Sequence, residues 1–248
     1  ALVTLLGREG CGAEVASAGE LAAALRASIA PDRIVFAGPG KSREEHLAAI
    51  AAGIRAIHLE SSAEADRLAE LAGRGRVDVG LRINPARPLA GAGMRMAGGT
   101  QAFGVDEEEA LALAARLQAG GRLHLKGLHI HLGAQIGRSR PLAEAWERFF
   151  DLAAKAARLL GRPLDHVDLG GGLAVPVQEG EVDPDLDALG ELLAPLWAGH
   201  QGRTAHELLV EPGRFLVARA GLFLARVMDV KRSRGERFLV LEIGRAHV

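Results

Sequence analysis

The feature that most constrains this chain is an alternation between short apolar runs and longer stretches of helical period. The short runs are rich in Val, Ile and Leu, and the longer ones in Ala, Leu, Glu and Arg. This alternation is typical of βα units around a parallel sheet. The expected strands are Ala13 to Ala16, Arg33 to Phe36, Ala56 to Leu59, Asp78 to Ile83, Gly127 to His131, His166 to Leu169 and Glu207 to Val210.

Helices are expected between these strands and at the start of the chain, where Leu2 to Leu6 is helix-like with no strand before it. Seven strands are one short of the eight that close a (β/α)8 barrel. We therefore expect an α/β fold, a TIM barrel whose first strand preceded Ala1. The expected helices are Gly19 to Ser28, Arg43 to Ala52, Ala63 to Ala72, Glu107 to Ala119, Pro141 to Leu160 and Leu186 to Trp197.

The rhythm changes after the seventh strand. The pattern predicts two consecutive strands, Ala220 to Val230 and Phe238 to Leu241, separated only by a basic turn, Lys231 to Arg237. The last residues, Glu242 to Val248, resemble the translation of a sequencing adapter. We expect a barrel domain over 1–219, truncated at its N-terminus, the beginning of a C-terminal β domain over 220–241, and a non-native tail over 242–248.

Composition narrows the class of partners. A formal net charge of −1 and a pI near 6.9 argue against a nucleic-acid or anionic-membrane partner, because either favours a concentrated basic face. No apolar run approaches the roughly 20 residues that span a bilayer, and the N-terminus lacks the order of a signal peptide. We expect a cytoplasmic protein. The single cysteine, Cys11, is given no role.

In a βα barrel the active site lies at the C-terminal ends of the strands, so polar and glycine-rich residues that follow a strand are the candidates. Gly170, Gly171 and Gly172 follow one strand and let the backbone approach an anion such as phosphate, although three glycines also suit a plain tight turn. Glu211 and Arg214 follow the next strand. An arginine there suits phosphate, while a solvated ion pair at a surface turn is the alternative.

Two further segments have open interpretations. His129 and His131 lie two apart on an expected strand and share a face, so they could bind a metal, stack on an aromatic ligand or be core histidines. In the opening segment, Ser17 can cap a helix and Glu20 can complete the capping box, which explains both without function.

Taken together and in order, these motifs resemble the fold-type III pyridoxal-phosphate decarboxylases, the family of diaminopimelate, ornithine and arginine decarboxylases. The resemblance covers essentially Ala1 to Leu241. Two stretches, Gly91 to Asp106 and Gly170 to Leu186, look most like the exosortase-associated branch and like acyl-carrier-linked decarboxylases. The matching motifs are GCGAEVASAGEL from Gly10, FAGPGKS from Phe36, LRINP from Leu81, FGVD from Phe103, GLHIHLGAQI from Gly127, DLGGG from Asp168 and EPGRFLVARAG from Glu211.

The resemblance implies a barrel of the alanine racemase/ornithine decarboxylase type that binds pyridoxal 5'-phosphate, and it implies no metal ligand. Glu211 matches the acid that bonds the pyridine nitrogen, and His131 matches the histidine stacked on the ring. The remaining matches are a phosphate cradle at Gly171, Gly172, Gly213 and Arg214, acidic and capping residues near the cofactor at Glu14, Ser17 and Glu20, and a supporting strand-end arginine at Arg82.

The chain departs from the family pattern at several positions. Glu14 is longer than the usual aspartate, Ala134 stands where a serine commonly bonds the phosphate, and Ala102 stands where many relatives have lysine. Gln135 or a backbone amide is a candidate to replace the missing serine contact.

The family's Schiff-base lysine lies on a strand upstream of Ala1, and none of Lys41, Lys126, Lys155 and Lys231 matches it. The C-terminal domain, which in the family supplies a cysteine-containing loop across the dimer interface and a cofactor-contacting tyrosine, is also absent, in line with a sequence without tyrosine. We expect the intact protein to be a homodimer and the chain as given to be inactive.

The function that the resemblance implies is decarboxylation of an amino acid to an amine and CO₂. The substrate stays open among diaminopimelate-like, basic and carrier-linked amino acids. One alternative is a homologue that binds the cofactor or a partner without turnover. A second is a metal-dependent barrel hydrolase that uses His129 and His131 with Asp168 or Glu211.

Overall fold

A computed structural model describes residues 1–89, 94–95, 97–177, 180–222 and 224–242. The chain divides into two compact units, Ala1–Phe215 and Leu216–Val248. The expected domain limits at 219 and 220 fall close to this division and stay a prediction. The expected tail, apart from Glu242, lies outside the described residues, as do parts of the two stretches that resemble the exosortase-associated branch.

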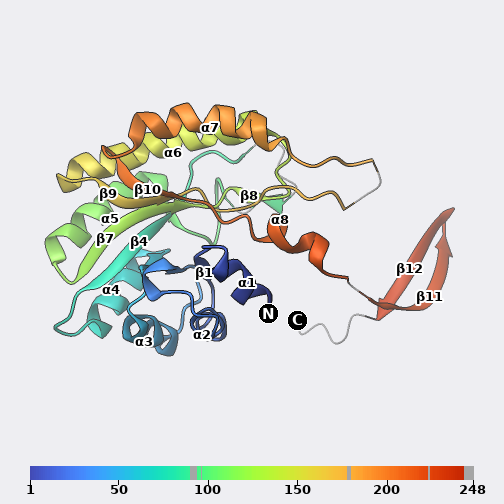
Figure 1. Ribbon diagram of the computed structural model, residues 1–248, viewed down its shortest axis with the longest axis horizontal. Helices are drawn as coiled ribbons and strands as arrows, with labels where there is room; N and C mark the ends of the chain where they lie inside the picture. Colours follow the sequence, from blue (N-terminus) through green and yellow to red (C-terminus); the bar gives the residue numbers. More distant parts are fainter. Residues whose placement is uncertain (90–93, 96, 178–179, 223, 243–248) are drawn as a thin grey trace. The chain divides into compact units, whose positions relative to one another are not determined.

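The first unit is built on one parallel sheet with the strand order β1-β2-β3-β4-β7-β9-β10, to which the two-residue β6 adds beside β4. The sheet curls, and its helices lie along its outer side (Figure 1). All seven predicted strands are present, which confirms the predicted α/β class. The strands are β1 (Ala13–Val15), β2 (Ile34–Phe36), β3 (Ala56–Leu59), β4 (Val77–Asn84), β6 (Val105–Asp106), β7 (Leu123–Ile130), β9 (Leu164–Asp168) and β10 (Ala205–Leu209).

The predicted helices are also present, with ends that differ by up to three residues. Serine side chains at Ser17, Ser42 and Ser61 cap three of them by accepting a backbone N–H three residues on, which fixes where these helices begin. The helices are α1 (Leu2–Arg8), α2 (Ala18–Arg26), α3 (Arg43–Ala52), α4 (Ser62–Leu71), α5 (Glu107–Gly120), α6 (Ser139–Leu160), α7 (Leu186–His200) and the short α8 (Gly213–Val217), with a 3₁₀ turn at Pro31–Arg33.

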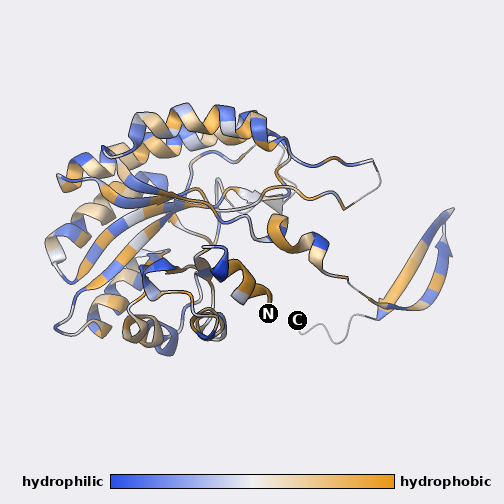
Figure 2. Cartoon of the chain, in the orientation of Figure 1, coloured by the Kyte–Doolittle hydropathy of each residue, from blue (hydrophilic) through white to orange (hydrophobic). Residues whose placement is uncertain are grey.

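The core lies between the sheet and the helices. Trp146, Phe149 and Phe150 of α6 are buried, and the Phe150 ring lies 5.0 Å from that of His200 on α7. Hydrophobic and hydrophilic residues mix along α6 and α7 (Figure 2), as expected of helices with one buried face. No helix within the described ranges is both long and apolar enough to cross a membrane.

Residues on alternate positions of the strands face the inside of the curled sheet. One cross-strand row joins His58 to Gly80, Gly80 to Gly127 and Gly127 to His166. A second row, two positions further on, joins Arg82 to His129 and His129 to Asp168. Polar residues thus form inward rows where a parallel barrel ordinarily has branched apolar side chains.

The second unit contains an antiparallel hairpin of β11 (Arg226–Ser233) and β12 (Glu236–Glu242), preceded by a 3₁₀ turn at Ala218–Ala220. The predicted strand over Ala220 to Val230 is therefore wrong at its start. The predicted basic turn over Lys231 to Arg237 is also too long, since the strands are separated only by Arg234 and Gly235, both with positive φ. Two such residues form a tight hairpin turn, and the basic residues beside them belong to exposed strands. A further pair of short strands, β5 (Met94–Arg95) and β8 (Gly133–Ala134), lies in the first unit.

Candidate active site

The predicted site residues of the first unit gather at the C-terminal ends of the strands. Glu14 lies on β1 and Arg82 near the end of β4, while His131 follows β7 and Glu211 follows β10. The three glycines follow β9. The parallel sheet brings these residues to one edge, as the strand-end rule predicts.

Glu211 is the most distinctive residue of this edge. Its side chain is 14% exposed, and its Oε2 lies 3.5 Å from Nε2 of His129. Its Oε1 is buried and has no hydrogen-bond partner among the described residues. Burial raises the pKa of Glu211, whereas a hydrogen bond with the Asp168 carboxyl group and the charge of Arg82 act to lower it. A buried carboxylate oxygen with no partner is suited to accept a hydrogen bond from a ligand.

The glycines after β9 let three loops approach one another closely. A Cβ atom on Gly171 would stand 2.0 Å from the Glu211 carbonyl oxygen, and one on Gly172 would stand 2.1 Å from the Gly133 carbonyl oxygen. Glu211 N–H donates to the Gly170 carbonyl at 2.9 Å. Only glycine fits these positions, because backbone atoms occupy the space of a side chain.

His131 borders the same loops. Its Nδ1 accepts the Gly171 N–H at 3.4 Å, which leaves the ring proton on Nε2. Burial, with smaller contributions from His129 and Arg82, lowers the pKa of His131 to about 4. The imidazole is therefore uncharged at neutral pH, and its faces can stack on a flat ligand.

Acidic groups crowd this edge. The Glu14 side chain reaches solvent, yet partial burial and the charges of Glu211 and Asp168 raise its pKa to about 8. Burial, followed by the charge of Glu211, raises the pKa of Asp168 to about 8. Such a concentration of perturbed carboxyl groups is typical of functional sites.

Arg82 is buried and held from two sides. Its Nη1 lies 3.2 Å from Oε1 of Glu60, and its guanidinium lies 4.9 Å from the centre of the Phe103 ring. Glu60 also accepts the N–H groups of Gly38 at 2.6 Å and Gly104 at 3.1 Å. Our sequence reasoning missed Glu60, although it directly follows β3 and the strand-end rule would have found it.

Other predicted residues make local contacts. Ser17 Oγ accepts the Glu20 N–H at 3.2 Å, and Glu20 Oε2 accepts the Ala16 N–H at 2.7 Å, so both cap α2. Gly213 and Arg214 begin α8 and are exposed.

Two departures from the family pattern have structural consequences. The amide of Gln135 binds both backbone groups of Val175, at 2.9 and 3.1 Å, and is committed to that contact rather than free to replace the serine missing at Ala134. Lys41 is buried in an ion pair with Glu64 at 2.8 Å, and Lys126 pairs with Asp165.

The chain matches the family described as pyridoxal-dependent decarboxylase, pyridoxal binding domain, over residues 1–218, and it belongs to that family. It is 36% identical to a diaminopimelate decarboxylase of Zymomonas mobilis over 247 residues, which are 98% of this chain and 57% of the relative. It is 30% identical to an L-glutamyl-[BtrI acyl-carrier protein] decarboxylase of Niallia circulans, over 99% of this chain and 58% of the relative.

The fold agrees with solved structures of the same family. The crystal structure of diaminopimelate decarboxylase from Helicobacter pylori complexed with L-lysine matches with a TM-score of 0.83 at 29% identity, over 98% of this chain and 60% of that chain. The chain thus spans somewhat more than half the length of the relatives it matches.

Pyridoxal phosphate is the cofactor of this family, and the residues of the site fit it. The free buried oxygen of Glu211 suits the N–H of a protonated pyridine ring. The uncharged imidazole of His131 suits the ring face. The glycines after β9 have no side chain, so the backbone there can approach a phosphate group closely.

Proposed function

We propose that the intact protein uses pyridoxal phosphate to decarboxylate an amino acid, giving an amine and CO₂. The observation that carries this proposal is the buried carboxylate of Glu211 with its free Oε1. The cofactor, when bound, supplies an aromatic ring that takes up the electron pair left behind when CO₂ departs. Glu211 accepts the N–H of the ring nitrogen and so keeps a proton at that atom.

The other residues position the cofactor in this proposal. His131 covers one face of the ring and, being uncharged, does not oppose the positive charge of the ring nitrogen. Gly172 offers its backbone N–H group to the phosphate, and Arg214 offers its guanidinium. Gly171 and Gly213, whose N–H groups donate to His131 Nδ1 at 3.4 Å and to the Glu211 carbonyl at 2.8 Å, shape the loops around the phosphate.

The acids at the other side of the site have supporting roles. Glu14 lies beside the cofactor at the end of β1, while Ser17 and Glu20 hold the turn that follows it. Arg82, fixed by Glu60, faces the same edge and moderates the acid charge there, since it lowers the pKa values of Glu14 and Glu211.

The substrate is proposed to be an amino acid of the diaminopimelate-like, basic or carrier-linked kind. The relatives support the first and third, since they include diaminopimelate decarboxylases and a decarboxylase of glutamyl groups on an acyl-carrier protein. A homodimer in the cytoplasm, without nucleic-acid or membrane partners, completes the proposal. We further propose that the barrel spans 1–219, that a β domain begins at 220, and that this chain alone is inactive.

The test is made on the intact gene product. It is purified, its visible absorbance is recorded before and after borohydride reduction, and CO₂ release is measured with diaminopimelate, lysine, ornithine, arginine and a carrier-bound glutamate. We expect a visible band that borohydride abolishes, one lysine that becomes modified, and CO₂ release from one class of substrate.

Other results separate the alternatives. A coloured protein that releases no CO₂ from any substrate supports a non-catalytic cofactor-binding homologue. A colourless protein that cannot be reconstituted with pyridoxal phosphate contradicts the proposal. Metal-dependent hydrolysis by that protein would then favour the hydrolase hypothesis.

A further inference from the structure

The inside of the curled sheet is shaped for histidines. His58 of β3 lies opposite Gly80 of β4, and His166 of β9 lies opposite Gly127 of β7. A Cβ atom on Gly80 would stand 2.4 Å from His58 Cδ2, and one on Gly127 would stand 2.4 Å from His166 Nε2. The two glycines therefore make room for imidazole rings over the middle of the sheet.

The next inward row adds His129 and Asp168, which are register partners on β7 and β9. The rings of His58 and His129 stack with centroids 4.8 Å apart. One ligand atom from each of His58, His129 and Asp168 lies within 4.8 Å of the other two. Side chains from three strands thus converge inside the sheet.

These three side chains are closed off from solvent yet have few polar partners. Their exposed fractions are 0% for His58, 1% for His129 and 0% for Asp168. Within the described part of the chain, neither ring nitrogen of His58 has a hydrogen-bond partner, and His129 has only Oε2 of Glu211, 3.5 Å from its Nε2. The carboxyl group of Asp168 interacts with that of Glu211. Oδ1 of Asp168 accepts the Gly170 N–H at 2.9 Å. Unpaired buried polar atoms are destabilising, and a bound ion is one explanation for them.

We propose that His58, His129 and Asp168 bind one divalent transition-metal ion of the zinc type. Two imidazole nitrogens and one carboxylate oxygen are a ligand set that zinc accepts, whereas magnesium and calcium prefer oxygen alone. Zinc bonds of about 2.1 Å place tetrahedral ligands roughly 3.4 Å apart. The ligand atoms lie within 4.8 Å of one another, so they draw closer together when the ion binds.

The charges around the site agree with a cation. Asp168 is buried, and Glu211 brings a second carboxylate, with its Oε2 3.5 Å from His129 Nε2. The proposed ion brings positive charge to this pair of carboxyl groups. The site depends on neither pyridoxal phosphate nor decarboxylation, so its failure and that of the proposed function are separate results.

The experiment measures metal retained by the 248-residue chain. The chain is produced without an affinity tag in zinc-supplemented medium and dialysed against metal-free buffer, and its zinc content is measured by inductively coupled plasma mass spectrometry. We expect close to one ion per chain, and a fall of at least about tenfold in His58→Gln and Asp168→Asn. His124→Gln, a histidine of the same strand as His129 but at its start, is the matched control and should keep the metal.

Two results overturn the proposal: a wild-type chain without zinc, or equal zinc in wild type and His58→Gln. Because the variants could fail to fold, the wild type is also loaded with cobalt(II). Intense visible bands of a four-coordinate ion are expected, and the weak bands of a six-coordinate ion contradict the site.

Discussion

The two ends of β9 place aspartates in opposite surroundings. Asp168, at the C-terminal end, has a pKa raised to about 8 by burial and by Glu211. For Asp165, near the start, burial acts to raise the pKa, but the hydrogen bond and charge of Lys126, with Arg162, lower it overall. The carboxyl group at the C-terminal end lies beside a second acid, Glu211, whereas the one near the start of the strand pairs with Lys126.

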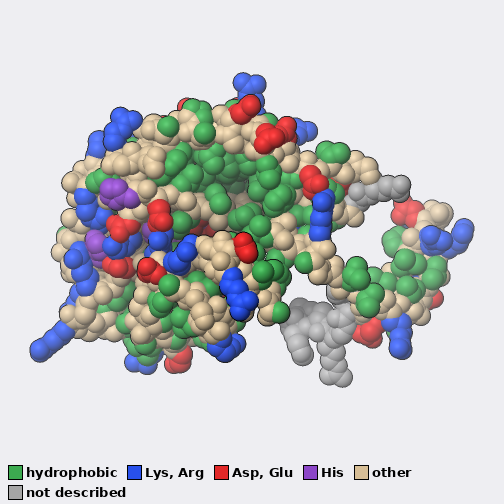
Figure 3. All heavy atoms as spheres, in the orientation of Figure 1, with side chains coloured by type: hydrophobic (Ala, Val, Ile, Leu, Met, Phe, Trp, Pro, Cys, Tyr) green, Lys and Arg blue, Asp and Glu red, His purple; other side chains and the backbone are tan. Residues whose placement is uncertain are grey.

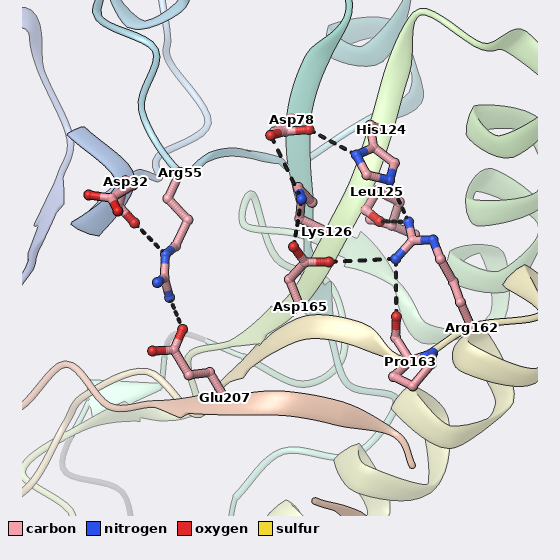
Figure 4. A network of polar contacts seen from close by, with 10 residues as sticks. All are labelled: Asp32, Arg55, Asp78, His124, Leu125, Lys126, Arg162, Pro163, Asp165 and Glu207. Atoms are coloured by element: carbon pink, nitrogen blue, oxygen red, sulfur yellow. Dashed lines mark hydrogen bonds and ion pairs between the residues drawn. The ribbon is translucent and has the colours of Figure 1, made fainter. Parts of the chain in front are cut away.

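The strand-start end is held by a network of satisfied contacts (Figure 4). His124 binds Asp78 at 2.9 Å and Arg162 at 2.9 Å, and Arg162 also donates to the Leu125 carbonyl at 2.6 Å. Arg55 pairs with Glu207, 152 positions away along the chain. Histidine, acidic and basic side chains also intermingle on the surface in the space-filling view (Figure 3). In a barrel, the strand-start end serves stability and the strand-end side serves function, and these contacts follow that division.

The largest expected effect breaks the packing of the strand-end loops. Gly171→Ala places a methyl group 2.0 Å from the Glu211 carbonyl, so we expect it to lower the free energy of unfolding by about 3 kcal/mol. Gly190→Ala is the matched control, since Gly190 lies within α7 with open space around it and the change should raise stability by up to about 1 kcal/mol. Urea unfolding measures both. Equal stability of the two variants would show that the loops are not closely packed.

The second effect is a difference in pH dependence between the two ends. The pKa of Glu14 is raised to about 8, so the folded state binds its proton more tightly than the unfolded state does, and this contribution is lost as pH rises from 4.5 to 8. Glu14→Gln should therefore reduce the change in the free energy of unfolding across that pH window. The reduction is about 1 kcal/mol, because the side chain is exposed. Chemical unfolding at a series of pH values measures it.

Asp165→Asn is the counterpart at the strand-start end. Its pKa is lowered in the folded state, so its contribution is present above the ordinary value of 3.8 and is lost as pH falls through the folded value. The variant should be slightly less stable at neutral pH and equal to wild type in acid. If Glu14→Gln and Asp165→Asn altered the pH dependence of the unfolding free energy in the same direction, the contrast between the two ends of the sheet would be contradicted.

The smallest expected effect concerns the pair of Arg55 and Glu207. The Glu207 side chain is 55% exposed, and exposed pairs contribute less than about 1 kcal/mol. Glu207→Gln should change the thermal midpoint little and leave cofactor binding unchanged. A large loss in either measurement would mean that the strand-start end takes part in function.

The fold was largely predictable because apolar runs mark buried strands whatever their partners. The strand ends were less so. β7 begins at Leu123 rather than Gly127, because His124 and Lys126 are polar and become strand residues only through Asp78 and Asp165 on its neighbours. Such partners are distant in sequence, so a local pattern does not contain them.

The site was predictable in part. Motif resemblance and the strand-end rule located Glu211, His131 and the glycines at one edge. His58 and His166 were not singled out, because His58 lies in an apolar run and His166 between Asp165 and Val167, where both look like ordinary strand residues. Their interior stacking depends on glycines of neighbouring strands, which only the register brings opposite them.

The central claim is that Glu211 and the strand-end loops hold pyridoxal phosphate. The most direct measurement is a titration of the 248-residue chain with pyridoxal phosphate, followed by the change in protein fluorescence, for wild type, Glu211→Gln and the strand-start control Glu207→Gln. We predict saturable binding that weakens at least about 30-fold, or ~2 kcal/mol, in Glu211→Gln and is unchanged in Glu207→Gln. Equal binding by Glu211→Gln and wild type would contradict the account.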